Sequence, residues 1–266
     1  MLELHQFEAS HYCEKVRLLL DYKQLPYTTI EVVPGIGQIE LYRLSGQRQV
    51  PVLKDGEVVV SDSSAIAQYL EKTYPERSII PAGGKEKGLC LALEALADES
   101  IGTNGRKAMI GAFNQHPNFR TALLPISTPD VLKTAVGALP GDVLSLLGMG
   151  VGLGPEAVKS ATDILKQDLE AICLILQEQA YLCGEEPCLA DFAVAGLSMY
   201  LKFPSELYVD LPSGICGKGV PGLVDDPAFS EFWVWRDRLY TDFRRPRGGR
   251  PSGGAAATGP VAIGIE

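Results

Sequence analysis

Ser10-His11-Tyr12-Cys13-Glu14-Lys15-Val16-Arg17-Leu18-Leu19-Leu20 is the stretch of this chain that decides its fold. It follows a strand predicted over Leu2–Phe7 and opens a helix predicted over Tyr12–Lys23, where apolar side chains recur at helical spacing. The first amide groups of a helix lack intrahelical partners and lie at the positive end of its dipole, so a helix start can hold an anion. A hydroxyl (Ser10) and a thiol (Cys13) lie at this start. The pattern therefore indicates sulfur chemistry there.

Strands and helices alternate over the first eighty residues. After the first strand and helix, the sequence predicts a strand (Tyr27–Val33), a short helix (Ile36–Leu44), a hairpin (Pro51–Lys54 and Glu57–Val60) and a helix (Ser63–Thr73). The hairpin turns at Asp55-Gly56, a strong turn signal. The order β-α-β-α-β-β-α predicts an α/β domain, which we place at 1–78.

The pattern changes after this domain. Pro75–Lys87 is rich in Pro, Gly and charge and is predicted to be a linker. Helical spacing then dominates, which predicts an all-helical domain over 85–243. The clearest helices are expected over Pro155–Ala180, Asp191–Phe203 and Pro227–Phe243. Residues 244–266, rich in Arg, Gly, Pro and Ala, bury too little apolar surface to fold, so we expect a disordered tail.

Composition excludes several classes of function. The 266 residues carry a net charge of −9, which disfavours a nucleic-acid partner. The N-terminus lacks the basic start and apolar run of a signal peptide, and the six cysteines form no Cys-x-x-Cys pair. We therefore expect reduced thiols in the cytoplasm. The three histidines are scattered, and we expect no metal site.

Residues 123–154 are apolar but interrupted by prolines and glycines. Their longest apolar run is well short of the ~20 residues that a spanning helix needs. We expect an insertion of helices and loops, with contact to a membrane surface as the second interpretation.

Two interpretations of the Ser10 hydroxyl follow from its position. A thiol pKa near 8.5 must fall by roughly two units for substantial ionisation at neutral pH, which takes about 2.7 kcal/mol. A hydrogen bond to a charged acceptor contributes roughly 1.5–3 kcal/mol and a helix N-terminus roughly 0.3–1 kcal/mol. Ser10 and the helix start could thus activate a bound thiolate without a general base. Alternatively, Ser10 only caps the helix.

Cys13 is either a reactive thiol or, as we prefer, a small apolar group that packs inward.

Two further motifs lie beside this helix start. Val50-Pro51 opens a strand and is a candidate cis peptide bond, which would present the Val50 backbone to an extended peptide. Asp62-Ser63 precedes an apolar helical stripe, so it either only caps the helix or receives a carboxylate and an ammonium group. Together the motifs fit a small peptide with a thiol, an amide backbone and a zwitterionic end.

In that order and spacing, 10–17, 50–53 and 62–66 resemble the N-terminal domain of the glutathione S-transferase superfamily. The resemblance implies a thioredoxin-like N-terminal domain, an all-helical C-terminal domain and glutathione as co-substrate. It implies that Ser10 stabilises the glutathione thiolate, that Val50 and a cis Pro51 hold the cysteinyl backbone, and that Asp62 and Ser63 hold the γ-glutamyl end. It also implies a cytoplasmic homodimer that conjugates small hydrophobic electrophiles in detoxification.

The chain departs from this family at three places. His11 stands where many members have proline, Cys188 stands at a helix-capping position usually held by Ser or Thr, and 100–154 is longer than in typical members. Parts of the chain are also similar to the membrane-associated prostaglandin E synthase branch, which has cysteine at the position of Ser10. Two alternative functions stay open: a glutathione-dependent thiol oxidoreductase or isomerase that uses Cys13, and a non-catalytic protein that binds glutathione, another ligand or a partner.

Overall fold

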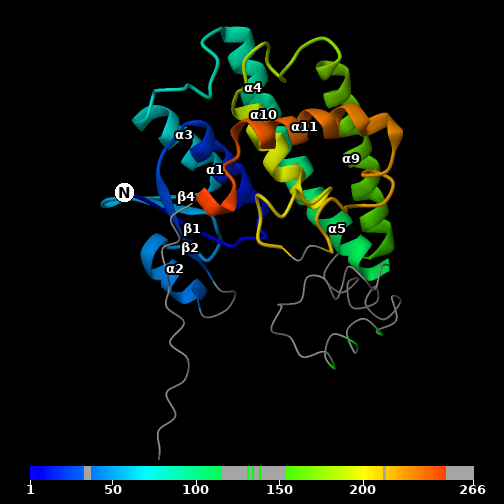
Figure 1. Cartoon of the computed structure of the whole chain (residues 1–266), viewed down its shortest axis with the longest axis horizontal. Coiled ribbons are helices and arrows are strands. Elements are labelled where there is room, and N and C mark those ends of the chain that lie inside the picture. Colours follow the sequence, from blue (N-terminus) through cyan, green and yellow to red (C-terminus); the bar gives the residue numbers. More distant parts are fainter. Residues whose placement is uncertain are drawn as a thin grey trace, which may run out of the picture.

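The computed structural model describes residues 1–32, 37–115, 154–211 and 214–249, together with the single positions 131, 134 and 138. A four-stranded mixed sheet lies at the N-terminal end, and a mostly helical region follows it (Figure 1). The strands are β1 (Leu2–Gln6), β2 (Tyr27–Glu31), β3 (Val52–Asp55) and β4 (Val58–Ser61). The predicted combination of a thioredoxin-like α/β part and a helical part is confirmed.

The helices follow the predicted order with small changes at their ends. They are α1 (His11–Tyr22), α2 (Gly37–Ser45), α3 (Ser63–Thr73), α4 (Gly84–Leu96), α5 (Thr103–Gln115), α9 (Pro155–Leu176), α10 (Leu189–Leu197) and α11 (Ser230–Phe243). Short helical turns lie at η1 (Ala97–Gly102), η2 (Ser198–Tyr200), η3 (Pro227–Phe229) and η4 (Arg247–Gly249). The helix expected over Asp191–Phe203 instead begins at Leu189 and tightens into the turn η2 after Leu197.

The sheet has the strand order β2-β1-β3-β4. β1 runs parallel to β2 and antiparallel to β3, and β3 pairs with β4 in the predicted hairpin. Leu4 and Leu53 are partners across β1 and β3, and both side chains are fully buried. The alternation of buried and partly exposed residues along β1 explains why its sequence predicted a strand.

Helix α1 lies at the centre of the molecule, between the sheet and the helical region (Figure 1). It packs against α3 on one side and against α10 on another. Of its twelve residues, all but Tyr12 are buried, including four that are charged. Such a helix can be stable only if each of those charges finds a partner, and the partners come largely from the helical region.

The contact between α1 and α10 depends on Gly196. A Cβ atom built there would lie 2.6 Å from the Cα and N atoms of Lys15, both of them backbone atoms that cannot easily move. We expect Gly196→Ala to lower the free energy of unfolding by about 2 kcal/mol through this overlap. Gly88 is the matched control, because it is exposed inside α4 and a Cβ there meets nothing within 4 Å.

Gly88→Ala is expected to raise the free energy of unfolding by about 0.5–1 kcal/mol, since it removes only the helix penalty of glycine. Urea denaturation of both variants measures the two effects. Similar small changes at both positions would contradict the close approach of α1 and α10.

The structure corrects the predicted start of the disordered tail. Residues 244–249 are placed, and Arg244 is 2% exposed. Its guanidinium contacts Glu14 at 2.8 Å and Asp21 at 2.5 Å, so the segment after α11 is held against α1. A composition rule failed here because a single buried ion-pair group anchors residues whose average character is that of a flexible linker. Residues 250–266 lie outside the described part of the chain.

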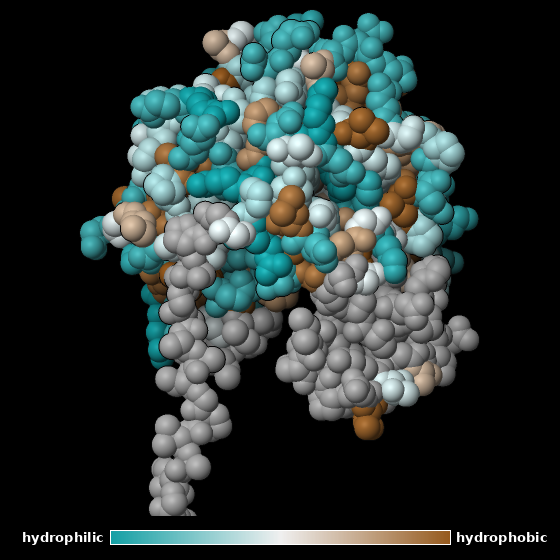
Figure 2. Space-filling model, in the orientation of Figure 1, coloured by the Kyte–Doolittle hydropathy of each residue, from teal (hydrophilic) through white to brown (hydrophobic). Residues whose placement is uncertain are grey.

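The predicted insertion over 123–154 also lies outside the described residues, apart from the single positions 131, 134, 138 and 154. Among the described helices, none combines the length and the apolar composition that a membrane span requires. On the face drawn in Figure 2, hydrophobic side chains form small separate patches within a mostly hydrophilic surface.

Candidate functional site

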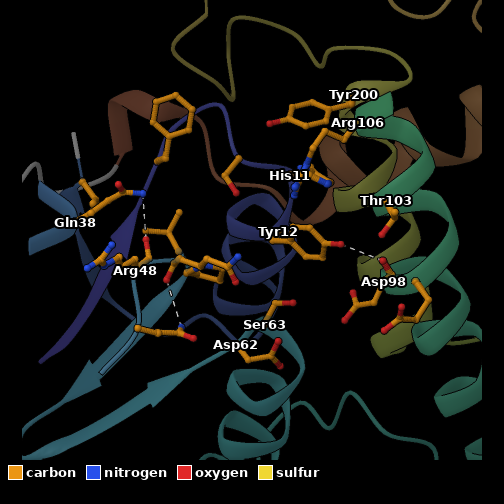
Figure 3. A pocket seen from close by; sticks show the side chains of 18 residues that line it. His11, Tyr12, Gln38, Arg48, Asp62, Ser63, Asp98, Thr103, Arg106 and Tyr200 are labelled. Atoms are coloured by element: carbon orange, nitrogen blue, oxygen red, sulfur yellow. Dashed lines mark hydrogen bonds between the residues drawn. The ribbon is translucent and has the colours of Figure 1, made fainter. Parts of the chain in front are cut away.

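A cavity of about 610 Å³ opens between the sheet and the first helices of the helical region. All five residues predicted for the site line it: Ser10, Val50, Pro51, Asp62 and Ser63. They come from the segment before α1, the start of β3 and the start of α3 (Figure 3). The volume is in the range of small-molecule sites, roughly 300–1,000 Å³.

Ser10 occupies the N-cap position of α1. Its Oγ accepts a hydrogen bond from the Cys13 amide at 3.3 Å, and its own amide donates to the Phe7 carbonyl at 2.9 Å. A hydroxyl group has one proton and two acceptor positions, so capping leaves the proton available for a second partner. The two interpretations of Ser10 are therefore compatible: the same oxygen can cap the helix and donate to an anion in the cavity.

Cys13 lies one turn into α1 and is fully buried. Burial raises the pKa of its thiol to about 11, and the nearby Arg17 charge and the Ser10 hydrogen bond offset only part of this effect. A thiol with this pKa and no exposure is a poor nucleophile at neutral pH. The geometry favours the prediction that Cys13 packs inward.

The Val50–Pro51 peptide bond is cis, as the sequence suggested. Both residues line the cavity directly before the first paired residue of β3. Side-chain amides support the preceding backbone: Gln38 donates to the Arg48 carbonyl and Gln47 donates to the Gln49 carbonyl, each at 3.3 Å. These contacts hold the segment before the strand as one wall of the cavity (Figure 3).

Asp62 and Ser63 form the third part of the site. The Asp62 carboxylate caps α3 by accepting from the Ser64 and Ala65 amides, both at 3.0 Å. Its backbone has φ of 78°, a conformation that non-glycine residues rarely adopt and that costs roughly 1–3 kcal/mol. The Ser63 hydroxyl is buried and finds no hydrogen-bond partner among the described residues. Strained backbone beside an unpaired buried hydroxyl is typical of a binding site.

A buried charge network supports this part of the site from behind. The Lys15 ammonium, with no exposed side-chain area, contacts Glu94 at 2.6 Å and Asp98 at 2.8 Å. It also donates to the Ser64 hydroxyl at 3.1 Å. The network thus links α1, α3, α4 and η1 where Asp98 reaches the cavity. Nothing local in the sequence indicates it, because its members lie up to 83 residues apart.

The opposite wall comes from residues that the sequence did not predict. Tyr12 donates from its hydroxyl to the Asp98 carbonyl at 3.0 Å. The His11 ring lies 4.1 Å from the Tyr200 ring, centroid to centroid, and Arg106 and Thr103 extend from α5 beside them (Figure 3). This wall is mostly polar, and its arginine side chain is exposed.

The surroundings of His11 favour its neutral form. Its Nε2 atom donates to the Gly102 carbonyl at 3.0 Å, which leaves Nδ1 as a bare acceptor without a partner in the described part of the chain. Burial, assisted by the Arg106 charge, lowers the pKa of the imidazole to about 3. His11 therefore cannot serve as a general acid or base at neutral pH.

The lowered His11 pKa predicts a change of stability with pH. The unfolded chain binds a proton near the ordinary pKa of 6.5, whereas the folded chain resists protonation down to about 3. The contribution of His11 to the free energy of unfolding is therefore fully present above pH 6.5 and is lost as the pH falls from 6.5 to about 3. We expect the free energy of unfolding to fall more steeply between these pH values in the parent chain than in His11→Gln, whose amide keeps the Gly102 contact. Urea denaturation at a series of pH values measures the difference, and parallel curves would contradict it.

Residues 4–78 match the family model described as "Glutathione S-transferase, N-terminal domain". The chain is 35% identical over 103 residues to a zeta-class glutathione S-transferase of Euphorbia esula, a match that covers 38% of this chain and 46% of that protein. It is 36% identical over 104 residues to a probable maleylacetoacetate isomerase of Vibrio cholerae, and this match covers 36% of this chain and 48% of that protein.

The aligned part thus spans about half the length of these relatives. Among solved structures, FzlA from C. crescentus superimposes with a TM-score of 0.58 at 21% identity, over 95% of this chain and 96% of that one. At this identity the likeness concerns the fold, and it extends through the helical region.

Proposed function

Because this chain belongs to the glutathione S-transferase superfamily, we propose that its cavity binds glutathione and that Ser10 donates a hydrogen bond to the thiolate of the bound tripeptide. The thiolate then adds to a small electrophile. One observation carries this proposal: two helix starts, one strand edge and the Ser10 hydroxyl face a single cavity.

The proposed orientation of glutathione follows from the chemistry of the three segments. The thiolate lies at the start of α1, where free amides and the helix dipole favour a negative charge. The cysteinyl backbone pairs with the edge at Val50. The α-carboxylate of the γ-glutamyl group accepts from the Ser63 hydroxyl at the start of α3, while its ammonium group contacts the Asp62 carboxylate.

The proposed reaction needs no general base on the protein. Glutathione loses its thiol proton to water, because the Ser10 hydrogen bond and the start of α1 lower the pKa of the bound thiol. The sulfur lone pair then forms a bond to the electrophilic carbon. In a substitution, the leaving group departs with the electron pair of the broken bond; in an addition to a conjugated alkene, the adjacent carbon takes up a proton.

The polar wall indicates the class of electrophile. The sequence predicts a small hydrophobic co-substrate, but Arg106, Thr103 and Glu99 line the half of the cavity next to α5. A co-substrate with a carboxylate or carbonyl group suits the exposed Arg106 guanidinium better than a hydrocarbon does.

The polar wall favours cis–trans isomerisation as a second candidate function. In that reaction the thiolate adds to a conjugated double bond, the resulting single bond rotates, and elimination returns glutathione. The similarity to a probable maleylacetoacetate isomerase supports this candidate, since that name describes an acidic substrate.

Calorimetric titration with glutathione tests the binding step. We expect a saturable heat at millimolar glutathione, and Ser63→Ala is expected to weaken binding about tenfold or more, because a hydrogen bond to a carboxylate contributes roughly 1.5–3 kcal/mol. Ser78→Ala, which removes an exposed serine outside the cavity, is the control. Absence of heat with the parent chain would contradict the proposal and would favour a protein that binds another ligand or partner.

Activity assays separate the remaining possibilities. Product formed with a halogenated nitrobenzene supports conjugation, whereas glutathione-dependent conversion of a cis-enedione acid to its trans form supports isomerisation. Activity that persists in Ser10→Ala and disappears in Cys13→Ala would instead support the thiol oxidoreductase, which the burial and raised pKa of Cys13 disfavour. The homodimer, the cytoplasmic location and the role in detoxification remain part of this proposal.

A further inference from the structure

Three cysteine side chains meet inside the helical region, away from the cavity described above. Cys90 lies on α4, Cys183 lies in the connection between α9 and α10, and Cys188 directly precedes α10. Their Sγ atoms lie within 4.8 Å of one another, and all three residues are buried. None of them lines the cavity proposed to bind glutathione. This group is called the three-cysteine cluster below.

We propose that the three-cysteine cluster binds one thiophilic metal ion, Zn²⁺ or Cu⁺, through three thiolate sulfurs. Thiolates are the ligands that select these ions among the metals available to proteins. Metal binding at the cluster is independent of glutathione binding, because the cluster and the cavity share no residue. It revises the expectation from the sequence that the chain has no metal site.

The spacing of the sulfurs suits a single ion. Two sulfurs bound at about 2.3 Å to one tetrahedral zinc lie about 3.8 Å apart. The observed limit of 4.8 Å therefore requires each pair to approach by no more than about 1 Å. Side-chain rotation of the three cysteines can supply such a movement without a change of fold.

Asp191 holds the segment that carries Cys183 and Cys188 in place. One carboxylate oxygen accepts from the Leu182 amide at 2.8 Å, and the other accepts from the Cys188 amide at 2.9 Å. The second oxygen also lies 3.2 Å from the Cys188 sulfur, so it can accept the thiol proton or provide an oxygen to the ion. Residues on both sides of the Cys183–Cys188 segment are thus fixed before any ion binds, which favours binding.

Backbone contacts complete the support. Tyr181 and Gly184 form a two-residue bridge that turns the chain back at Cys183. The Leu189 amide donates to the Ile79 carbonyl at 2.7 Å, which ties the start of α10 to the segment before α4. The start of α10 also directs its positive dipole end toward the sulfurs, and this offsets part of the negative charge that three thiolates bring.

Ion binding at the three-cysteine cluster is a ligand exchange. Each thiol releases its proton to solvent, its sulfur donates an electron pair to the ion, and bound water leaves the ion in exchange, with no change of oxidation state. Ion binding therefore predicts proton release, a readout that does not depend on enzymatic activity.

The test uses the full chain, reduced and freed of metal, and titrated separately with Zn²⁺ and Cu⁺ under anaerobic conditions. We expect about one equivalent of one of these ions to survive dialysis, a rise in Tm of about 5 °C or more, and release of about two to three protons per ion. Co²⁺ added instead of Zn²⁺ should give the intense visible absorption of a tetrahedral thiolate site.

Matched variants locate the ion. Cys90→Ser and Cys183→Ser are expected to lose the retained ion and the shift of Tm, whereas Cys216→Ser, a half-buried cysteine outside the cluster, should keep both. Circular dichroism verifies that each variant folds. If Cys90→Ser does not fold, Cys183→Ser alone provides the test. Asp191→Asn with an altered Co²⁺ spectrum but full stoichiometry would support an oxygen ligand from Asp191.

Three results would overturn the proposal. The first is retention of well under one equivalent of either ion by the reduced parent chain. The second is equal retention by Cys183→Ser and Cys216→Ser, which would mean binding elsewhere. The third is that the parent chain and the variants Cys90→Ser and Cys183→Ser show the same proton release and the same shift of Tm when the ion is added. Any of these would leave the cluster as three separate apolar core residues.

Discussion

Replacing Ser10 by alanine is expected to lower kcat/KM for glutathione addition by about 10- to 100-fold. The proposed hydrogen bond from the Ser10 hydroxyl to the thiolate contributes roughly 1.5–3 kcal/mol, and it acts on the charged form of the sulfur alone. Its removal therefore raises the pKa of the bound thiol, so less of the complex is ionised at neutral pH. His11 cannot compensate, since its pKa is lowered to about 3 by burial.

The pH dependence of the rate distinguishes this loss from a general defect. In Ser10→Ala the rise of kcat with pH, measured with glutathione saturating, should shift to higher pH by up to about two units, and the kcat values of variant and parent should converge at alkaline pH. Ultraviolet absorption of the thiolate in the glutathione complex gives the same pKa without turnover. A variant that is slow at every pH by the same factor would contradict a role in ionisation.

Ser10→Thr is the matched control, because threonine keeps both the hydroxyl and the ability to cap a helix. Alanine also removes the acceptor for the Cys13 amide, which costs roughly 0.5–2 kcal/mol of stability. Tm measurements on both variants separate this structural effect from catalysis. Equal loss of activity in Ser10→Thr and Ser10→Ala, with the Tm of Ser10→Thr equal to that of the parent, would mean that the hydroxyl has no special role.

Local patterns predicted the α/β part of the fold well, and the reason is physical. The sheet is built from short strands whose turn residues and alternating burial are encoded in neighbouring positions, as at Asp55-Gly56. Each part of the candidate site is likewise local, since a helix start or a strand start depends on a few adjacent residues. Each part could therefore be predicted from its neighbours, whereas the grouping of Ser10, Val50 and Ser63 around one cavity was expected mainly because the three motifs together resemble a known family.

The missing features are contacts between distant residues. Lys15 meets Asp98 across 83 positions, and His11 meets the Gly102 carbonyl across 91. Spacing in a single sequence carries no signal for such pairs, because the fold alone brings them together. The three-cysteine cluster was missed for the same reason: Cys90 lies more than ninety positions from Cys183 and Cys188, and these two form no Cys-x-x-Cys motif. The composition of the last residues predicted a disordered tail from 244 onward. At Arg244 this prediction is wrong, because its buried ion pair with Glu14 holds the chain against α1.

Arg244→Met is expected to lower the free energy of unfolding by about 3 kcal/mol and Tm by about 6–12 °C. The side chains of Arg244, Glu14 and Asp21 have no exposed area, and the arginine joins the two carboxylates on α1. Its loss leaves buried negative charge with fewer partners, a change that typically costs roughly 3–5 kcal/mol. We expect the lower value, because Glu14 keeps Arg17 and Asp21 keeps Arg245.

Arg247→Met is the control on the same segment. Arg247 pairs with Asp210 at 2.7 Å, but its side chain is 39% exposed and that of Asp210 is 65% exposed, so water screens the pair. An exposed ion pair contributes roughly 0–1 kcal/mol, and the variant should unfold close to the parent. Urea denaturation of both variants decides between two views of this segment. A large loss at Arg244 alone means that the chain after α11 is an integral part of the packing around α1; equally small losses mean that residues from 244 onward behave as the solvated tail that their composition predicts.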